Sequence, residues 1–126
     1  WGKSAVLAND ENVAAAIEWI RKQLPRGGTA TYDALDHGLA QEDIDTIYFL
    51  SDGVPSAGRY EERETILGEV RKRNRFRRVT IHTIALIIGL SPIESARKYE
   101  DPDDMAELMG RIATENQGRF SNQSRP

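Results

Sequence analysis

The chain has 126 residues, of which 39% are hydrophobic, so it can form the core of one ordinary domain. Its formal charge of −3 is mild, so no global electrostatic field argues for nucleic-acid or membrane binding. The sequence has no cysteine, which excludes disulfides and thiolate chemistry, and no run near the roughly 20 apolar residues of a membrane-spanning helix. These properties leave the cellular compartment open.

Helical and strand patterns alternate along the first two thirds of the chain. Apolar residues at helical spacing predict helices over 11–23 and 32–40. A nearly continuous apolar run over 44–50 predicts a strand buried on both faces, as in parallel sheets. A third helix is expected over 60–73, and a second buried strand over 79–88.

The last third of the chain continues this alternation. Residues 89–101 are expected to be irregular, because they contain a Ser-Pro pair. A helix should begin at Asp101–Pro102, with proline in its first turn, and end before Gly118. Residues 119–122 are the candidate for a short edge strand.

Strands that alternate with helices predict right-handed crossovers and an α/β fold with a parallel sheet. Two or three strands cannot bury both faces of such a sheet. We therefore expect a strand beside 44–50 to be missing, which leaves an apolar edge open. The chain also begins with Trp1 rather than Met, and we interpret it as a piece of a longer polypeptide.

The strand over 44–50 leads into Ser-Asp-Gly at 51–53, which places the carboxylate of Asp52 on a glycine turn. Ligands of open parallel sheets gather beyond the carboxyl ends of the strands. Upstream, Gly-Gly-Thr at 27–29 forms a second tight loop and offers the hydroxyl of Thr29. Hard cations such as Mg²⁺ prefer such oxygen ligands. Taken alone, Ser-Asp-Gly is best interpreted as a structural turn in which Asp52 caps nearby amides. The two loops together favour a metal site.

The two loops also carry a family resemblance. GGTATYDAL (27–35) and IYFLSDGVP (47–55) resemble the second half of a von Willebrand factor type A (vWA) domain. Residues 81–86 resemble the next core strand of that family, and 105–120 its last helix and strand, so nearly all of 1–126 is covered. The resemblance implies a Rossmann-like parallel sheet with helices on both faces. It also implies a metal-ion-dependent adhesion site (MIDAS) at the top of the sheet.

By this resemblance, Thr29 is the ligand of the second loop and Asp52 the acid of the third, binding the metal directly or through water. The first loop should read Asp-x-Ser-x-Ser, and no Asp of this chain is followed by Ser at both positions. We therefore expect residues 1–126 to be a partial vWA domain, incomplete at its N-terminal side. Mg²⁺, Mn²⁺ or Ca²⁺ should bind only if the missing loop is supplied. Residues 89–101 are longer than the family pattern and are interpreted as a neutral insertion, with a partner-facing loop as the alternative.

The favoured function is a non-catalytic protein-interaction module in which the metal binds an Asp or Glu carboxylate of a partner protein. One alternative is a Mg²⁺-dependent α/β hydrolase or phosphotransferase that uses Asp52, which would need a second acid or nucleophile. The other is a structural vWA module without a working metal site. No catalytic residue is assigned, because His37 and His82 have the sequence context of a surface and a sheet residue.

Residues 71–78 contain six cations in eight positions. A patch for an acidic partner or nucleic acid is conceivable there. We favour a solvated helix end, where cations suit the negative end of the helix dipole and the glutamates at 61–69 can offset them.

Overall fold

The computed structural model describes residues 5–24, 26–52, 54–87 and 102–124. The elements in chain order are α1 (Asp10–Arg21), α2 (Thr31–Leu39), β1 (Thr46–Ser51), α3 (Arg63–Asn74), β2 (Thr80–Ile87), α5 (Pro102–Glu115) and β3 (Phe120–Ser124). Each predicted helix and strand is present, with bounds shifted by a few residues. The predictions for Gly53 and for residues 89–101 lie outside the described residues.

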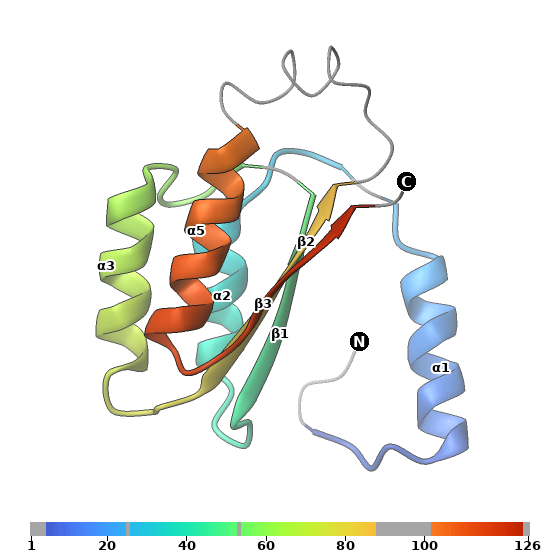
Figure 1. Ribbon diagram of the computed structural model, residues 1–126. Helices are drawn as coiled ribbons and strands as arrows, with labels where there is room; N and C mark the ends of the chain where they lie inside the picture. Colours follow the sequence, from blue (N-terminus) through green and yellow to red (C-terminus); the bar gives the residue numbers. More distant parts are fainter. Residues whose placement is uncertain (1–4, 25, 53, 88–101, 125–126) are drawn as a thin grey trace.

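The three strands form one parallel sheet in the order β1-β2-β3, with β2 in the centre (Figure 1). The register pairs Thr46 with Thr80 and Ser51 with Ala85, so β1 and β2 start together and β2 continues past the end of β1. Within the described residues, β1 has no strand on its other side. The parallel α/β prediction is therefore confirmed, and β1 is an edge strand.

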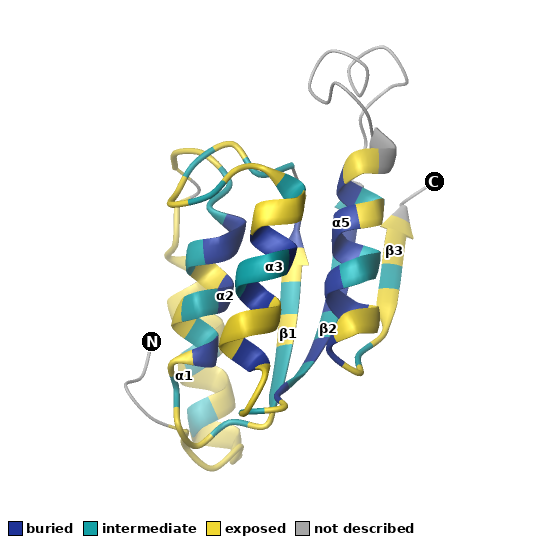
Figure 2. Cartoon of the chain, turned by 90° about the vertical axis from the view of Figure 1, so that its left-hand side faces the viewer, coloured by how far each residue is buried: buried dark blue, intermediate teal, exposed yellow. Residues whose placement is uncertain are grey.

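One face of the sheet carries the core, because α2, α3 and α5 all pack on it (Figure 2). Alternate residues of β2, namely Ile81, Thr83 and Ala85, have no solvent exposure. Ile81 lies in one cluster with residues of all three helices, and Ala85 packs against Met105 and Met109 of α5. The period of two along β2 thus explains why the helices gather on this face.

Among the described residues, none covers the opposite face of the sheet to a comparable extent. Helix α1 lies on that side (Figure 1) but buries none of its residues. Its apolar stripe is present, yet Ile17 and Ile20 remain 44% and 62% exposed. On β1, Tyr48 and Leu50 are 67% and 52% exposed, so the prediction that this strand is buried on both faces is wrong. Among the helices of the described segments, none has the length and hydrophobicity needed to cross a bilayer.

Two buried asparagines fasten the helix ends to the beginning of β2. The amide of Asn74, at the end of α3, donates to the Val79 carbonyl and to Asn116 Oδ1, both at 2.7 Å, and its Oδ1 accepts from the Val79 N–H at 2.8 Å. The Asn116 amide in turn donates to the Ile112 carbonyl at 2.8 Å. Because these groups satisfy one another away from water, they fix the end of α3, the end of α5 and the start of β2 as one unit.

Gly118 is required where the chain leaves α5. Its N–H donates to the Ala113 carbonyl at 2.8 Å, while Gln117 adopts a left-handed conformation at φ 60°, which closes the helix. A Cβ at Gly118 would overlap the carbonyl of Ile81 in β2. Gly118 is therefore needed for the close approach of two backbones, in addition to ending the helix.

Replacing Gly118 by alanine should destabilise the fold, since the backbone of β2 would have to move away. We expect Gly118→Ala to lower the free energy of unfolding by about 2–3 kcal/mol, as overpacked sites do. The matched control is Gly68→Ala in α3, where an added Cβ meets no atom within 4 Å. That change should raise stability by up to about 1 kcal/mol through helix propensity. Urea unfolding followed by circular dichroism measures both, and equal effects would contradict the assigned role of Gly118.

Candidate functional site

The candidate site lies at the carboxyl end of β1. Ser51 is the last residue of the strand, is paired in register with Ala85 and is 8% exposed. Asp52 follows directly and is exposed. The β1–β2 register therefore determines where this carboxylate emerges from the sheet.

The loop after Asp52 is held by contacts with the core and with the upstream loop. Val54 packs against Ala85 and the two methionines of α5, which places the loop on the end of the core. Ser56 contacts the upstream loop through two hydrogen bonds. Its Oγ accepts from the N–H of Thr29, and its own N–H donates to the Thr29 carbonyl, both at 3.0 Å. Both backbone groups of Thr29 are thus fixed, and the residue remains partly exposed.

Glycine at position 28 allows the two loops to approach this closely. An added Cβ at Gly28 would lie 2.8 Å from the Cβ of Ala57 and 3.0 Å from the Ser56 carbonyl oxygen. The first distance is shorter than real Cβ contacts, and the second is tighter than most of them. The predicted pairing of the Gly-Gly-Thr loop with the loop after Asp52 is therefore present as a direct contact.

Helix α2 holds the far side of the same loop through an acidic residue. Asp33 Oδ2 accepts from the Arg59 N–H at 2.7 Å, and the Arg59 guanidinium lies 3.6 Å from both Asp33 and Asp36. Gly58 has φ +96°, and a Cβ there would overlap the Asp33 carboxylate. The sequence analysis did not find Ser56, Asp33 and Arg59 as parts of the site. Two acidic residues on one helix do not indicate which distant loop they contact.

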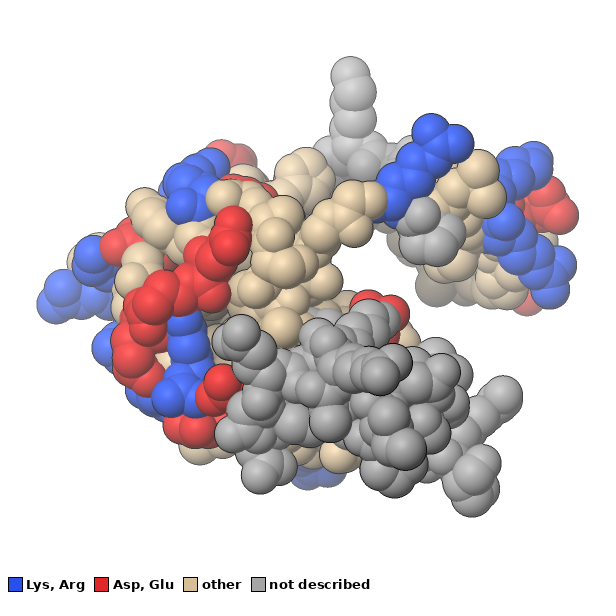
Figure 3. Space-filling view, turned by 90° about the horizontal axis from the view of Figure 1, so that it is seen from above, with Lys and Arg blue, Asp and Glu red and all other residues tan. Residues whose placement is uncertain are grey.

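Burial and hydrogen bonding shift two titratable groups next to these loops. Burial raises the pKa of Tyr32, and the nearby carboxylate of Asp36 raises it further, so the phenol stays neutral in the core. Glu62 caps α3. Its carboxylate accepts hydrogen bonds from the Thr65 hydroxyl and from the backbone N–H groups of Glu64 and Thr65, and these bonds, above all the one from the hydroxyl, lower the pKa of Glu62. Seen from above, acidic side chains gather over the α3 side of this face (Figure 3).

The oxygen atoms that this end of the sheet offers are of the type that a hard cation binds, but they are too few to hold one. Thr29 offers a neutral hydroxyl and Asp52 a carboxylate, whereas Mg²⁺ takes about six oxygen ligands. Over the segments that the structure describes, no group of three or more His, Cys, Asp or Glu could hold a metal ion. The ligand roles of Thr29 and Asp52 stay predictions, and other ligands would have to come from elsewhere.

The chain is similar to short segments of two much longer proteins. No family model matches the chain. It is 31% identical over 85 residues to the human von Willebrand factor A domain-containing protein 3B, and 29% identical over 86 residues to the human von Willebrand factor A domain-containing protein 3A. Each match covers 68% of this chain, and the chain spans only 6% and 7% of the length of these relatives.

The contact between the two loops can be tested without any ligand. Ser56→Ala removes the acceptor of the Thr29 N–H, which should weaken the contact by about 1 kcal/mol and speed amide exchange at Thr29 about fivefold. Thr114→Ala is the control, since its hydroxyl donates to the Gly110 carbonyl on an exposed part of α5. Hydrogen exchange followed by NMR measures both variants. Unchanged exchange at Thr29 in Ser56→Ala would show that the loops are held by other contacts.

Proposed function

This chain carries a vWA-like domain, and we propose that it forms part of a protein-interaction module that contacts its partner through a divalent metal ion at the carboxyl end of β1. The observation that carries the proposal is the reciprocal hydrogen bonding of Thr29 and Ser56, both at 3.0 Å. It joins the loop that offers a hydroxyl to the loop that follows the exposed Asp52. Domains of this kind are generally interaction modules rather than enzymes, and the proposal assigns no catalytic step.

The scaffold supports a preorganised site. Asp52 follows a strand whose register with β2 is set over six residue pairs. Thr29 precedes α2, whose Leu35 and Leu39 are buried in the core. Both residues therefore stand on elements that cannot shift without disturbing the core. Rigid support for ligating side chains is what a specific metal or partner contact needs.

Each residue would have a distinct task. Asp52 would contribute the negative charge that a hard cation requires. Thr29 would contribute a neutral oxygen, with its backbone held in place by Ser56. An ion bound there would supply positive charge with a coordination position left for an Asp or Glu carboxylate of the partner protein. Because hard cations prefer carboxylate oxygens, an acidic partner residue is the natural complement.

The module would need further ligands beyond these two residues. The resemblance indicates an Asp-x-Ser-x-Ser loop as their source, which would bring one acid and two hydroxyls. Since the chain spans only 6–7% of the relatives' length, the activity and partners of the whole protein are part of this proposal. The lack of a group of three acidic or His ligands within the described residues favours one competitor, a structural vWA module without a working metal site.

The proposal predicts metal binding that depends on Thr29 and Asp52. In a domain extended to include the upstream loop, Thr29→Ala and Asp52→Ala should each weaken Mg²⁺ binding at least about tenfold, as loss of a ligand does. Thr29→Ser, which keeps the hydroxyl, and Asp10→Ala, which removes an exposed acid on α1, should leave it unchanged. Isothermal calorimetry with MgCl₂ measures all four variants. Wild-type affinity in both alanine variants would contradict the ligand assignment.

The 126-residue chain by itself should bind Mg²⁺ poorly, with a dissociation constant above about 1 mM, because two ligands are too few. The same titration on this chain provides the test. Tight binding that survives Asp52→Ala would place the ion elsewhere and contradict the proposed site.

A further inference from the structure

The opposite end of the sheet carries the basic run at 71–78, and half of its six cations are paired with carboxylates. Four of its six cations have partners at hydrogen-bond distance, namely Arg71 with Glu115 (2.8 Å), Lys72 with Glu69 (2.5 Å), Arg73 with Asp36 (2.8 Å) and Arg77 with the Leu39 carbonyl (2.8 Å). Only Lys72 pairs within its own helix. The expectation that neighbouring glutamates offset the run therefore holds for one residue, while α2 and α5 supply the other partners.

Arg75 and Arg78 differ from the other four cations, of which Arg77 binds backbone carbonyls and the other three bind carboxylates. Neither makes an ion pair with any carboxylate in the described part of the chain, and both are exposed. The Arg75 guanidinium lies 5.3 Å from the centre of the Phe76 ring, which is itself 86% exposed. This is the most exposed large apolar side chain among the described residues. A guanidinium group without a carboxylate partner thus lies beside a solvent-exposed aromatic ring.

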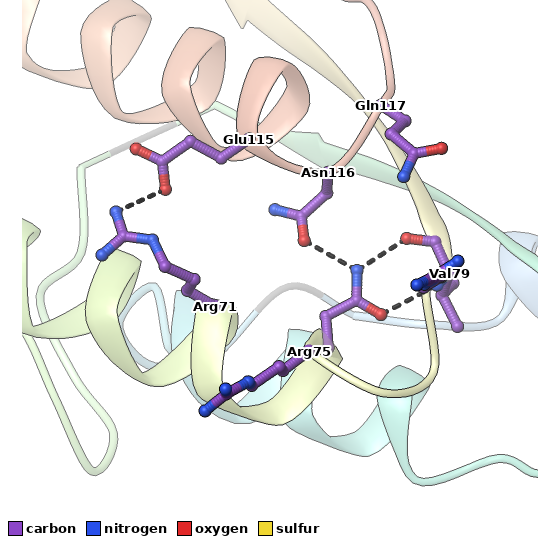
Figure 4. A pocket seen from close by; sticks show the side chains of 8 residues that line it. Arg71, Arg75, Val79, Glu115, Asn116 and Gln117 are labelled. Atoms are coloured by element: carbon purple, nitrogen blue, oxygen red, sulfur yellow. Dashed lines mark hydrogen bonds and ion pairs between the residues drawn. The ribbon is translucent and has the colours of Figure 1, made fainter.

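Arg75 and Arg78, but not Phe76, line a cavity of about 220 Å³ between the ends of α3 and α5 (Figure 4). Its floor is the pair of Asn74 and Asn116, whose side-chain amides are buried and already hydrogen-bonded. Arg71, paired with Glu115, forms one wall. Because the floor amides already have partners, the groups left for a ligand are those at the rim.

The backbone holds the rim in a defined conformation. Among the non-glycine residues that the structure describes, Arg78 and Gln117 have positive φ, at 55° and 60°, and both line this cavity. The N–H of Arg78 donates to the Asn74 carbonyl at 2.9 Å, and that of Gly118 to the Ala113 carbonyl at 2.8 Å. Such conformations persist only where surrounding contacts fix them. The rim side chains therefore project from rigid positions.

We propose that this cavity and Phe76 form a docking surface for an acidic segment of a partner protein. A carboxylate of the segment binds the guanidinium groups of Arg75 and Arg78, which suit planar oxygen pairs. An apolar side chain of the same segment packs on Phe76. The surface lies at the end of the sheet opposite to Asp52, so it does not rest on the metal site.

The charge balance favours a protein segment over nucleic acid. A nucleic acid presents a row of phosphates and needs several unpaired cations along its path. Among the described residues, Arg75, Arg77 and Arg78 have no carboxylate partner, and Arg77 already binds backbone carbonyls. Glu115 lies on the cavity wall, and the chain as a whole carries a charge of −3. One carboxylate beside one apolar side chain matches the surface better.

The test uses a capped pentapeptide in which a central phenylalanine is flanked by two glutamates on each side. Fluorescence anisotropy should show binding to the chain that weakens at least about tenfold in the Arg75→Gln/Arg78→Gln variant, through loss of charge-assisted hydrogen bonds. Phe76→Ala should weaken it several-fold. Arg21→Gln/Lys22→Gln, which removes the same charge from α1, should leave it unchanged. Arg75→Gln alone, which spares the left-handed position at 78, should give an intermediate loss.

A second peptide, with glutamine in place of each glutamate, should not bind measurably. No binding of the acidic peptide to the unmodified chain, or equal binding to the double arginine variant, would overturn the proposal. So would tighter binding of a single-stranded oligothymidine than of the acidic peptide, since that would assign the surface to nucleic acid.

Discussion

The rest of this structure depends on the burial of alternate β2 residues beneath α5. Ile81, Thr83 and Ala85 have no exposure, and the Thr83 hydroxyl donates to the Met109 carbonyl at 2.8 Å, so a hydrogen bond accompanies the apolar contact. Burying such side chains stabilises a fold by about 1.5–3 kcal/mol each for the larger ones. With β2 fixed to α5, the parallel registers of β1 and β3 follow, and with them the positions where their loops emerge.

The two ends of the sheet are consequently built in different ways. At the carboxyl end, Val54 packs against the core and Ser56 is hydrogen-bonded to Thr29, and these contacts hold two loops together. At the other end, Asn74 and Asn116 bind the helix ends to β2, which leaves only the side chains of the basic run to project outward. Each end therefore presents charged groups on a rigid base, acidic at Asp52 and basic at the α3 terminus.

Sequence patterns predicted the elements well because each depends on local spacing. The apolar run at 44–50 became β1 at Thr46–Ser51, and Pro102 begins α5 as expected. Helix α3 begins at Arg63 rather than near residue 60, because Glu62 caps it. The contacts that organise the loops, such as Ser56 with Thr29, join residues far apart in sequence, and no local pattern indicates them. The unburied stripe of α1 was equally beyond prediction, since periodicity does not say what a helix packs against.

The central claim is that this fold holds a metal-dependent contact at the carboxyl end of β1. Its most direct test is NMR of the domain extended by its upstream loop, titrated with Mn²⁺, whose unpaired electrons broaden nearby amide signals. The account predicts that the amides of Thr29 and Asp52 broaden first, while those of Asn74 and Asn116, at the other end of the sheet, stay sharp. Broadening that begins at Asn74 and Asn116, or that spreads evenly over exposed acidic residues, would contradict it.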